Sequence, residues 1–197
     1  MADYAELATV KAALGKLTTD DRDELIQAAI TSASRLIDAR TGRRFSLDDA
    51  PSTRTFPVNG RSFFDGVAYQ LLIDDLGATD GVTVETGAAS SGTWTPNTSF
   101  EFGQLNAVSL GRPITSLSTT YGWGAGTTNV RVTGRWGWPA VPSEVALATQ
   151  LLAARLYRRK DSPQGVIGSA DWGAVRVSRV DPDVEALIAH LTLPGFA

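Results

Sequence analysis

The chain of 197 residues contains no cysteine and a single histidine, His190. Without thiols it has no disulfides, no Cys-ligated zinc and no cysteine nucleophile. One imidazole excludes a His-rich metal site and leaves Ser–His chemistry without support. Neither a Gly-x-Ser-x-Gly elbow nor a Ser-x-x-Lys motif occurs in the sequence. We therefore predict that the protein is not an enzyme and has no catalytic, cofactor-binding or metal-binding residues.

Positive charge and long apolar runs are also scarce. The chain has three lysines, a net charge of −3 and an isoelectric point of about 5.1. A high-affinity nucleic-acid binder neutralises phosphates with a basic face, and this balance argues against one. No stretch approaches the roughly 18 apolar residues of a membrane helix, and the first residues lack the basic start and apolar run of a signal peptide. We expect a protein without a membrane partner that is made in a cytoplasm.

Composition changes sharply along the chain. Residues 51–140 hold 13 of the 19 glycines and four of the five tryptophans, but only 11 of the 39 charged residues. The flanks, 1–50 and 141–197, carry the other 28 charges and show helical periodicity. The predicted fold class is α+β: helical terminal segments that pack together, with a β-rich antiparallel insertion in the middle of the chain.

Two helices are predicted in the first flank. A short one covers Tyr4–Leu14 and is closed by Gly15. A second, of about 20 residues, has an apolar stripe at offsets 0, 4, 7 and 11, made by Ile26, Ile30, Ala33 and Ile37. The segment 18–21 (TTDD) supplies capping oxygens before this helix, and Gly42 ends it.

Two more helices are predicted in the last flank. One begins at Ser143, a natural N-cap after two prolines, and ends near the basic run 158–160. Its apolar face is wide enough for burial on two sides; the residues are Val145, Leu147, Ala148, Leu151, Leu152, Ala154 and Leu156. A short strand at 175–177 follows, and a final helix runs from Asp181-Pro182 to about His190.

The middle segment shows strand patterns separated by Gly, Asp and Ser clusters. A hairpin is predicted from Thr53–Val58 and Arg61–Phe64, joined by the Asn59-Gly60 turn. Further strands are predicted at Tyr69–Ile73, Val82–Glu85, Phe100–Val108 and Asn129–Thr133.

Several groups of residues are candidates for chemistry, each with a structural alternative. The acidic pairs 20–21, 48–49 and 74–75 lack EF-hand spacing, and adjacent strand residues point to opposite faces. The glycine-rich segment 122–126 lacks the spacing and lysine of a phosphate-binding loop, which favours a turn between strands.

Aromatic and basic residues give two further candidates. Trp94, Trp123, Trp136 and Trp138 are suited either to a stacking platform for sugars or bases or to packing in a small sheet. The cluster Arg155, Arg158, Arg159 and Lys160 is suited to DNA phosphate, to an acidic partner surface or to a solvated helix end.

Six segments in the helical flanks and next to them resemble the head-to-tail adaptor (head–tail connector) proteins of long-tailed bacteriophages. They are IDARTGRRF at 37–45, VTGRWGWP at 132–139, VPSEV at 141–145, LYRRKDSP at 156–163, GAVRVS at 173–178 and DPDV at 181–184. Their order and spacing carry the resemblance, since none is a catalytic motif. Smaller members of the family are mostly helical, so this chain resembles a version with a helical adaptor core, 1–50 and 141–197, and a β-rich insertion, 51–140.

The resemblance implies a structural role in the virion neck, at the head–tail junction. Such proteins form a ring of about twelve copies under the portal protein, extend the DNA channel and provide a platform for the stopper or tail-completion protein. Viral DNA passes through without sequence-specific binding, and the protein is made in the host bacterial cytoplasm. The expected partner-interface residues lie on the helix from 143 and in the C-terminal segment: Leu151, Arg155, Tyr157, Arg158, Arg159, Leu193 and Phe196.

Three alternatives remain at this point. A β-rich accessory or carbohydrate-binding module would use the tryptophans of the insertion. A small hydrolase is disfavoured by the missing nucleophile. A stopper or tail-completion protein is disfavoured by the helical flanks, because those components are built mainly from strands.

Overall fold

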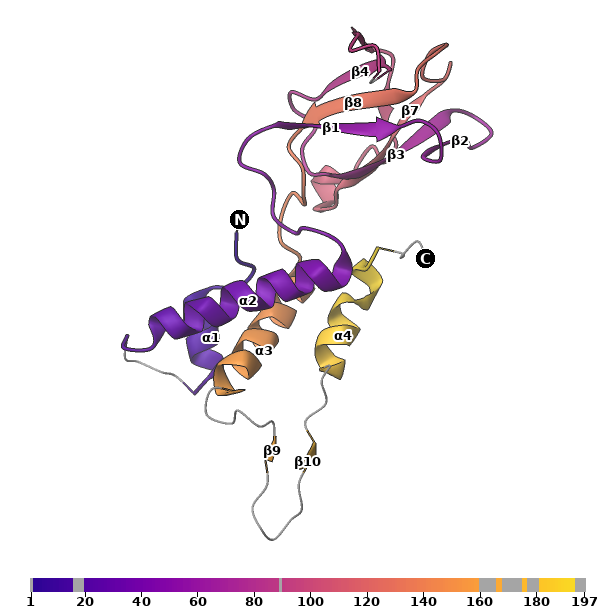
Figure 1. Cartoon of the computed structure of the whole chain (residues 1–197). Helices are drawn as coiled ribbons and strands as arrows, with labels where there is room; N and C mark the ends of the chain where they lie inside the picture. Colours follow the sequence, from indigo (N-terminus) through magenta and orange to yellow (C-terminus); the bar gives the residue numbers. More distant parts are fainter. Residues whose placement is uncertain are drawn as a thin grey trace. The chain divides into compact units, whose positions relative to one another are not determined.

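The computed structural model describes residues 2–15, 20–88, 90–159, 166–167, 175–176 and 181–193. The chain divides into two compact units, Met1–Arg43 with Val141–Ala197, and Arg44–Ala140. In the described residues the first unit contains four α-helices and the second contains two four-stranded antiparallel sheets (Figure 1). The predicted α+β class, with helical terminal segments around a strand-rich middle, is confirmed. We call the two parts the helical unit and the strand-rich unit.

In its described residues the helical unit has four α-helices and one short strand pair. They are α1 Leu7–Ala13, α2 Asp23–Thr41, α3 Ser143–Arg159 and α4 Pro182–Ile188, with a 3-10 turn at Ala189–Leu191 and the antiparallel pair β9 Val166–Ile167 and β10 Val175–Arg176. Asp181 caps α4 as predicted, because its carboxylate accepts from the Asp183 N–H. Ser143 is the first residue of α3 rather than its cap, and its hydroxyl donates to the Glu144 carboxylate.

Helix α2 follows the predicted stripe. Ile26, Ile30, Ala33 and Ile37 are all buried, and Gly42 ends the helix at φ 67° with its N–H on the Asp38 carbonyl. The left-handed φ suits glycine, which has no Cβ to clash there. The predicted start differs: the N-cap is Arg22, without a side-chain cap, while Thr18 and Thr19 lie outside the described residues.

Helix α3 packs against α1, α2 and α4. Its buried residues are Val145, Ala148, Thr149, Ala153, Ala154 and Tyr157. Ala153 and Tyr157 join Val10, Ile26 and Ile30 in one core between α1, α2 and α3. Helices α1, α2 and α3 therefore share one core, and the small buried residues of α3 allow the helices to approach closely.

The strand-rich unit contains eight short strands. They are β1 Ser52–Pro57, β2 Ser62–Phe64, β3 Tyr69–Leu76, β4 Thr83–Gly87, β5 Trp94–Pro96, β6 Glu101–Phe102, β7 Ile114–Thr119 and β8 Asn129–Gly134, with a 3-10 turn at Val108–Leu110. The two sheets have strand orders β1-β8-β4-β5 and β2-β3-β7-β6, and all pairs are antiparallel.

The hairpin predicted at Asn59-Gly60 is wrong. Strand β1 pairs with β8, where Phe56 faces Val130, and β2 pairs with β3, where Phe63 faces Gln70. The turn instead moves the chain from one sheet to the other, and the N–H groups of Arg61 and Ser62 both bond the Val58 carbonyl. A turn at this position is confirmed, with Gly60 at φ 79°, but the partner strands are not those predicted.

In the strand-rich unit two strands, β5 and β7, are not predicted from the sequence, and one strand is predicted too long; β9 in the helical unit is not predicted either. The segment from Gly103 to Val108 turns away after β6, with the Ala107 N–H on the Gln104 carbonyl, so a strand reaching Val108 is wrong. The sequence does not indicate strand β7, because its buried positions include Ser116 and Ser118, which obscure the alternation of apolar residues. Both hydroxyls have partners, since Ser116 accepts from Gln104 and Ser118 donates to the Glu101 carbonyl.

The core of the strand-rich unit lies between its sheets. Phe56, Val130 and Val132 face it from one sheet, and Leu71 and Leu117 from the other. Trp136, which is fully buried, donates its indole N–H to the Ser52 carbonyl at 2.8 Å. Residues 44–50 belong to this unit, since Phe45 packs on Trp138 with ring centroids 5.1 Å apart and the Asp48 N–H bonds the Trp136 carbonyl.

Candidate assembly interface

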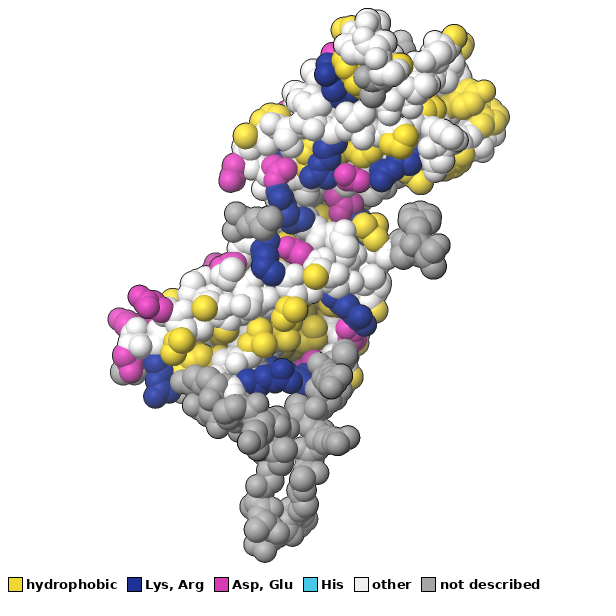
Figure 2. All heavy atoms as spheres, viewed as in Figure 1, with side chains coloured by type: hydrophobic (Ala, Val, Ile, Leu, Met, Phe, Trp, Pro, Cys, Tyr) yellow, Lys and Arg dark blue, Asp and Glu magenta, His cyan; other side chains and the backbone are white. Residues whose placement is uncertain are grey.

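Helices α2, α3 and α4 border an open groove in the helical unit. Its volume is about 260 Å³, and its apolar lining comes from Leu36, Ile37, Leu152, Leu156, Val184 and Ile188. Arg40 and Arg159 line it as well, together with Arg155, Asp181 and Glu185. In Figure 2 hydrophobic side chains gather on the helical unit between Lys or Arg side chains. The groove therefore combines an apolar floor with a charged border.

Two ion pairs fix α4 against its neighbours at this border. Arg40 Nε and Nη2 donate to the two oxygens of Glu185 at 2.8 and 3.0 Å. Arg155 Nη1 lies 3.2 Å from Asp181 Oδ2. The hydrogen bonds that Arg40 donates to Glu185 raise the pKa of Arg40 above its ordinary value. Both pairs hold α4, a helix of seven residues that also buries Val184 and Ile188.

Exposed leucines lie on the same helices. On α3, Leu147 and Leu151 are 45% and 38% exposed and stand four residues apart, so they share one face. On α2, Leu25 and Leu36 are 56% and 50% exposed at a spacing of 11 residues, which again returns to one face. These stripes leave apolar area on the surface of the helical unit.

The predicted interface residues fall into three groups. Leu151, Arg158 and Arg159 are exposed on α3, and Arg158 donates to the Ala13 carbonyl at 3.5 Å. Arg155 lines the groove. Tyr157 is buried in the helical core, where its hydroxyl accepts from Arg22.

The C-terminal candidates lie elsewhere. Leu193 is 43% exposed, and its N–H bonds the Thr41 carbonyl at 2.8 Å, beside the end of α2. Phe196 and Lys160 lie outside the described residues. The structure thus brings Arg155 and Arg159 together at the groove, and it places Leu193 at the C-terminal end of α2.

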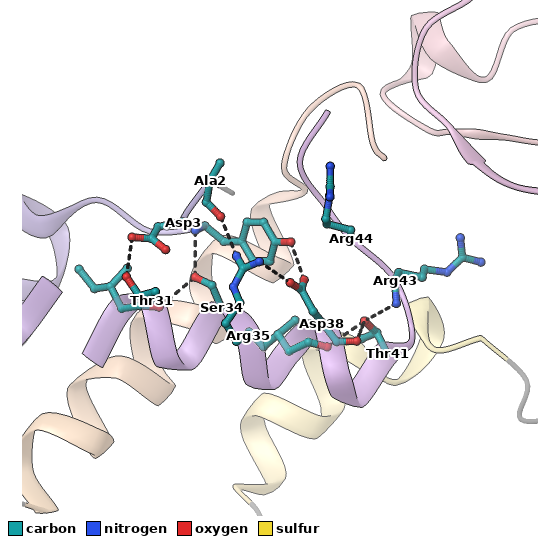
Figure 3. Close-up of polar contacts among 12 residues, drawn as sticks. Ala2, Asp3, Thr31, Ser34, Arg35, Asp38, Thr41, Arg43 and Arg44 are labelled. Carbon is teal, nitrogen blue, oxygen red and sulfur yellow. Dashed lines mark hydrogen bonds and ion pairs between the residues drawn. The ribbon is translucent and has the colours of Figure 1, made fainter. Parts of the chain in front are cut away.

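A polar network that the sequence did not indicate anchors the N-terminal segment to α2 (Figure 3). Asp3 accepts from Gln27 and Thr31 at 2.6 and 2.9 Å. Arg35 donates to the Ala2 carbonyl at 2.7 Å and pairs with Asp38 at 2.8 Å. In most of these bonds the two partners are more than twenty residues apart in the chain. Local sequence patterns therefore could not predict these contacts.

Tyr4 is the centre of this network. It is 4% exposed, its N–H bonds the Ser34 hydroxyl at 3.1 Å, and its own hydroxyl donates to Asp38. The Arg35 guanidinium lies 5.5 Å from the ring centroid. Because Tyr4 makes these contacts, it does not begin α1; the helix starts at Leu7, three residues later than predicted.

The acidic pairs have structural partners. Lys11 contacts Asp20 and Asp23, which raise its pKa, with the Asp23 hydrogen bond contributing most. Arg44 pairs with Asp48, Arg54 with Asp74 at 2.9 Å, and Asp75 accepts from the Trp138 indole. Within the described ranges no three His, Cys, Asp or Glu side chains form a group suited to a metal ion, and no helix is long and apolar enough to cross a membrane.

The glycine-rich segment 122–126 is a turn between β7 and β8, as favoured from the sequence. Gly122, Gly124 and Gly126 all have positive φ, between 75° and 96°. No helix follows the turn before α3, so it lacks the helix N-terminus of a phosphate-binding loop.

The four tryptophans of the insertion do not form a stacking platform. Trp136 and Trp138 are 0% and 7% exposed, and both indole N–H groups have partners. The Arg131 guanidinium covers the Trp94 ring at 4.6 Å from its centroid. Other residues of the strand-rich unit expose their apolar surface instead, and sequence reasoning missed them: Phe63, Phe64, Val67, Tyr69 and Tyr121.

No protein-family model and no curated protein matches this sequence. The fold is similar to that of a chain in the neck of an empty GTA particle computed with C6 symmetry, at 17% identity and a TM-score of 0.52, covering 98% of this chain and 92% of that chain. A chain in the virion of a native gene transfer agent (GTA) particle is 18% identical, with a TM-score of 0.52 and coverage of 98% and 92%. At these identities the likeness establishes a common fold over nearly the whole of both chains.

Proposed function

We propose that this chain is a structural protein of a phage-like particle, located in the neck at the head–tail junction. The observation that carries the proposal is the fold shared with a chain of a GTA neck over 98% of the present sequence. Fold alone does not define function. The adaptor-like segments at 37–45, 132–145, 156–163 and 181–184 support the same conclusion independently, since they rest on residues rather than on backbone shape.

Within the neck, the proposed role is that of the head-to-tail adaptor. About twelve copies form a ring under the portal protein, extend the DNA channel and offer a platform to the stopper or tail-completion protein. A ring of twelve contains six-fold symmetry, so it is compatible with a neck computed with C6 symmetry. The helical unit, which carries most of the adaptor-like segments, is the proposed core of this ring.

The surface of the helical unit supports self-association. Leu147 and Leu151 expose an apolar stripe on α3 next to a groove bordered by Arg155 and Arg159. Apolar area framed by charged residues is typical of protein interfaces, where the centre is dehydrated and the rim stays wet. We propose that this face contacts the neighbouring copy, and that Leu193 lies in the portal contact together with the C-terminal residues that include Phe196.

The charge of the chain suits passage of DNA. A net charge of −3 per copy gives a ring that does not clamp phosphates, because tight binding requires many Lys or Arg contacts. We infer that DNA passes without sequence-specific recognition. Synthesis in the host bacterial cytoplasm and a final location in the virion neck complete the proposal.

Native mass spectrometry tests this role on the purified chain, alone and after addition of the portal protein encoded beside it. A closed ring in either sample is the expected result. A chain that stays monomeric in both samples, without a portal complex, overturns the proposal.

The interface is tested with Leu151→Asp, which places a charge in the exposed stripe. We expect the ring to be lost while the helical circular dichroism signal is retained, because the Leu151 side chain is already 38% exposed. Leu105→Asp in the strand-rich unit is the matched control, since Leu105 is 80% exposed outside the proposed face. Equal loss of assembly in both variants would refute the assignment to this face of α3.

A further inference from the structure

A second groove lies on the strand-rich unit, and the proposed neck role does not involve it. Its volume is about 430 Å³, within the range of about 300–1,000 Å³ that is usual for small-ligand sites. The turn at Asn59-Gly60 and strand β2 form one part of the lining, and the glycine-rich turn at 122–127 forms another. In Figure 2 hydrophobic side chains gather at the end of this unit where Figure 1 labels β2.

Three aromatic rings give the groove flat apolar walls. Phe63, Phe64 and Tyr69 all line it and are 50%, 56% and 41% exposed. The Phe64 and Tyr69 rings lie 5.1 Å apart at an angle of 48°. Gly122 lies against the Tyr69 ring, where an added Cβ would be 3.7 Å away, so the turn follows the aromatic wall closely. Exposed rings held in place by neighbours are suited to stacking on a ligand.

The groove also offers hydrogen-bonding groups without charge. Asn59, Ser62 and Thr127 are among its lining residues, and none of the described lining residues is ionisable at neutral pH. The charged residues closest in sequence are engaged elsewhere: Arg61 faces Asp74, and Asp65 accepts from backbone N–H groups of its own turn. A phosphate-bearing ligand would need Lys or Arg here.

Trp123 adds a donor without a partner. It lines the groove, it is 5% exposed, and its Nε1 is buried with no acceptor among the described residues. The other two buried indoles of this unit, Trp136 and Trp138, donate to an oxygen at 2.8 and 3.0 Å. Buried polar groups are nearly always satisfied in folded proteins, so Trp123 is an exception in this unit, and its Nε1 is not exposed to the groove.

We propose that this groove binds a neutral saccharide. A sugar ring has an apolar C–H face that stacks on aromatic side chains, and its hydroxyls match amide and hydroxyl groups while carrying no charge. The site lies apart from the proposed assembly face of the helical unit in sequence and composition, and it does not depend on the neck role. Phe64 and Tyr69 form the stacking wall, and Asn59 and Thr127 bind the hydroxyls.

The test uses the full chain and a panel of neutral oligosaccharides: maltotriose, cellotriose and triacetylchitotriose. Saturation-transfer NMR detects the bound sugar, and isothermal titration measures its affinity. At least one neutral trisaccharide is expected to bind, while the anionic probe adenosine monophosphate does not. Failure of every trisaccharide at millimolar concentration overturns the proposal, as does a preference for the anionic probe.

Variants locate the site. Phe64→Ala is expected to weaken binding about tenfold by removing a stacking ring. Thr127→Val, which keeps the shape and removes the hydroxyl, is expected to weaken it about threefold. Tyr121→Ala removes an aromatic ring that is 91% exposed but does not line the groove, so affinity should be unchanged. Sugar binding that survives Phe64→Ala overturns the assignment.

A second copy of the chain is the alternative occupant, because β2 is an edge strand with an unpaired side. Sedimentation of wild type and Phe64→Ala, each with and without sugar, separates the two occupants. Self-association that Phe64→Ala abolishes and that excess trisaccharide leaves unchanged would overturn the saccharide assignment. A mass independent of both changes, together with sugar binding, supports it.

Discussion

The two units differ in how they use charge. The helical unit carries 25 of the 39 charged residues, and ion pairs such as Arg40–Glu185 and Arg155–Asp181 join segments far apart in the chain. The strand-rich unit has 14 charges in 97 residues and exposes aromatic rings instead. Charged side chains are depleted at the centres of protein interfaces, so the exposed leucines of α3 rather than the ion pairs carry the proposed self-association. Exposed aromatic rings are suited to stacking, which is the basis of the proposed saccharide site.

Each unit also has its own core, and Trp136→Ala tests whether the cores are independent. Trp136 is fully buried, its ring lies 5.7 Å from Phe56, and the Arg54 guanidinium covers it at 4.5 Å. Its removal should cost about 3–5 kcal/mol of stability. Four of the five tryptophans lie in the strand-rich unit, so fluorescence reports mainly its unfolding, while circular dichroism at 222 nm reports the helices.

We expect the fluorescence transition of Trp136→Ala to fall to lower temperature and the helical transition to stay near that of wild type. Leu110→Ala, at a position 72% exposed in the same unit, is the control and should change stability by less than about 0.5 kcal/mol. Parallel shifts of both transitions would show that the two cores unfold together.

Ile30→Ala is the reciprocal change in the helical unit. Ile30 is fully buried between α1, α2 and α3, so truncation should cost about 3 kcal/mol through lost burial and a cavity. The helical transition at 222 nm should move, with little change in tryptophan fluorescence. Leu36→Ala, on the same helix but half exposed, should leave both transitions within about 0.5 kcal/mol of wild type.

The two units also differ in how far the sequence could predict them. Helix α2 was recoverable because the stripe from Ile26 to Ile37 and the stop at Gly42 are local signals that the core then uses. Strand pairing is not local. Phe56 faces Val130 on β8 rather than a residue across the Asn59-Gly60 turn, and alternation indicates which face a residue takes without naming its partner strand.

The candidate sites show the same limit. From the sequence, the tryptophans are candidates for a stacking platform. In the structure, Trp136 and Trp138 lie in the interior and donate to a carbonyl and a carboxylate. A weaker signal was present in the adjacent pair Phe63-Phe64. Neighbouring residues of a strand point to opposite faces, so two successive aromatics in a sheet with one core place at least one ring outside it. Which groove that ring lines depends on contacts between distant segments.

Tyr4→Phe tests the contribution of a single polar contact to the stability of the helical unit. The change removes the hydroxyl that donates to Asp38 and leaves the ring in place. A buried hydrogen bond to a charged group contributes about 1.5–3 kcal/mol, and here Asp38 keeps its pair with Arg35, so we expect a loss near the lower limit. Thermal unfolding at 222 nm measures it. Tyr121→Phe, whose side chain is 91% exposed, should have no effect, and an equal shift in both variants would contradict the anchor role of Tyr4.

The smallest expected effect compares one carboxylate in each unit as pH falls. The pKa of Asp65 is lowered by the backbone N–H groups of Ala68 and Val67 and then by Gln70, and the pKa of Glu144 is lowered by its own backbone N–H and the Ser143 hydroxyl. A folded pKa below the unfolded one stabilises the protein above the unfolded value, and that contribution is lost as pH falls through the folded pKa. Asp65→Asn and Glu144→Gln should therefore lower Tm slightly at pH 7, by less than Tyr4→Phe, and the gap to wild type should narrow as pH falls below the ordinary carboxyl pKa. Asp65→Asn should act on the fluorescence transition and Glu144→Gln on the helical one. A gap that does not narrow as pH falls would mean that shape rather than charge is responsible at that position.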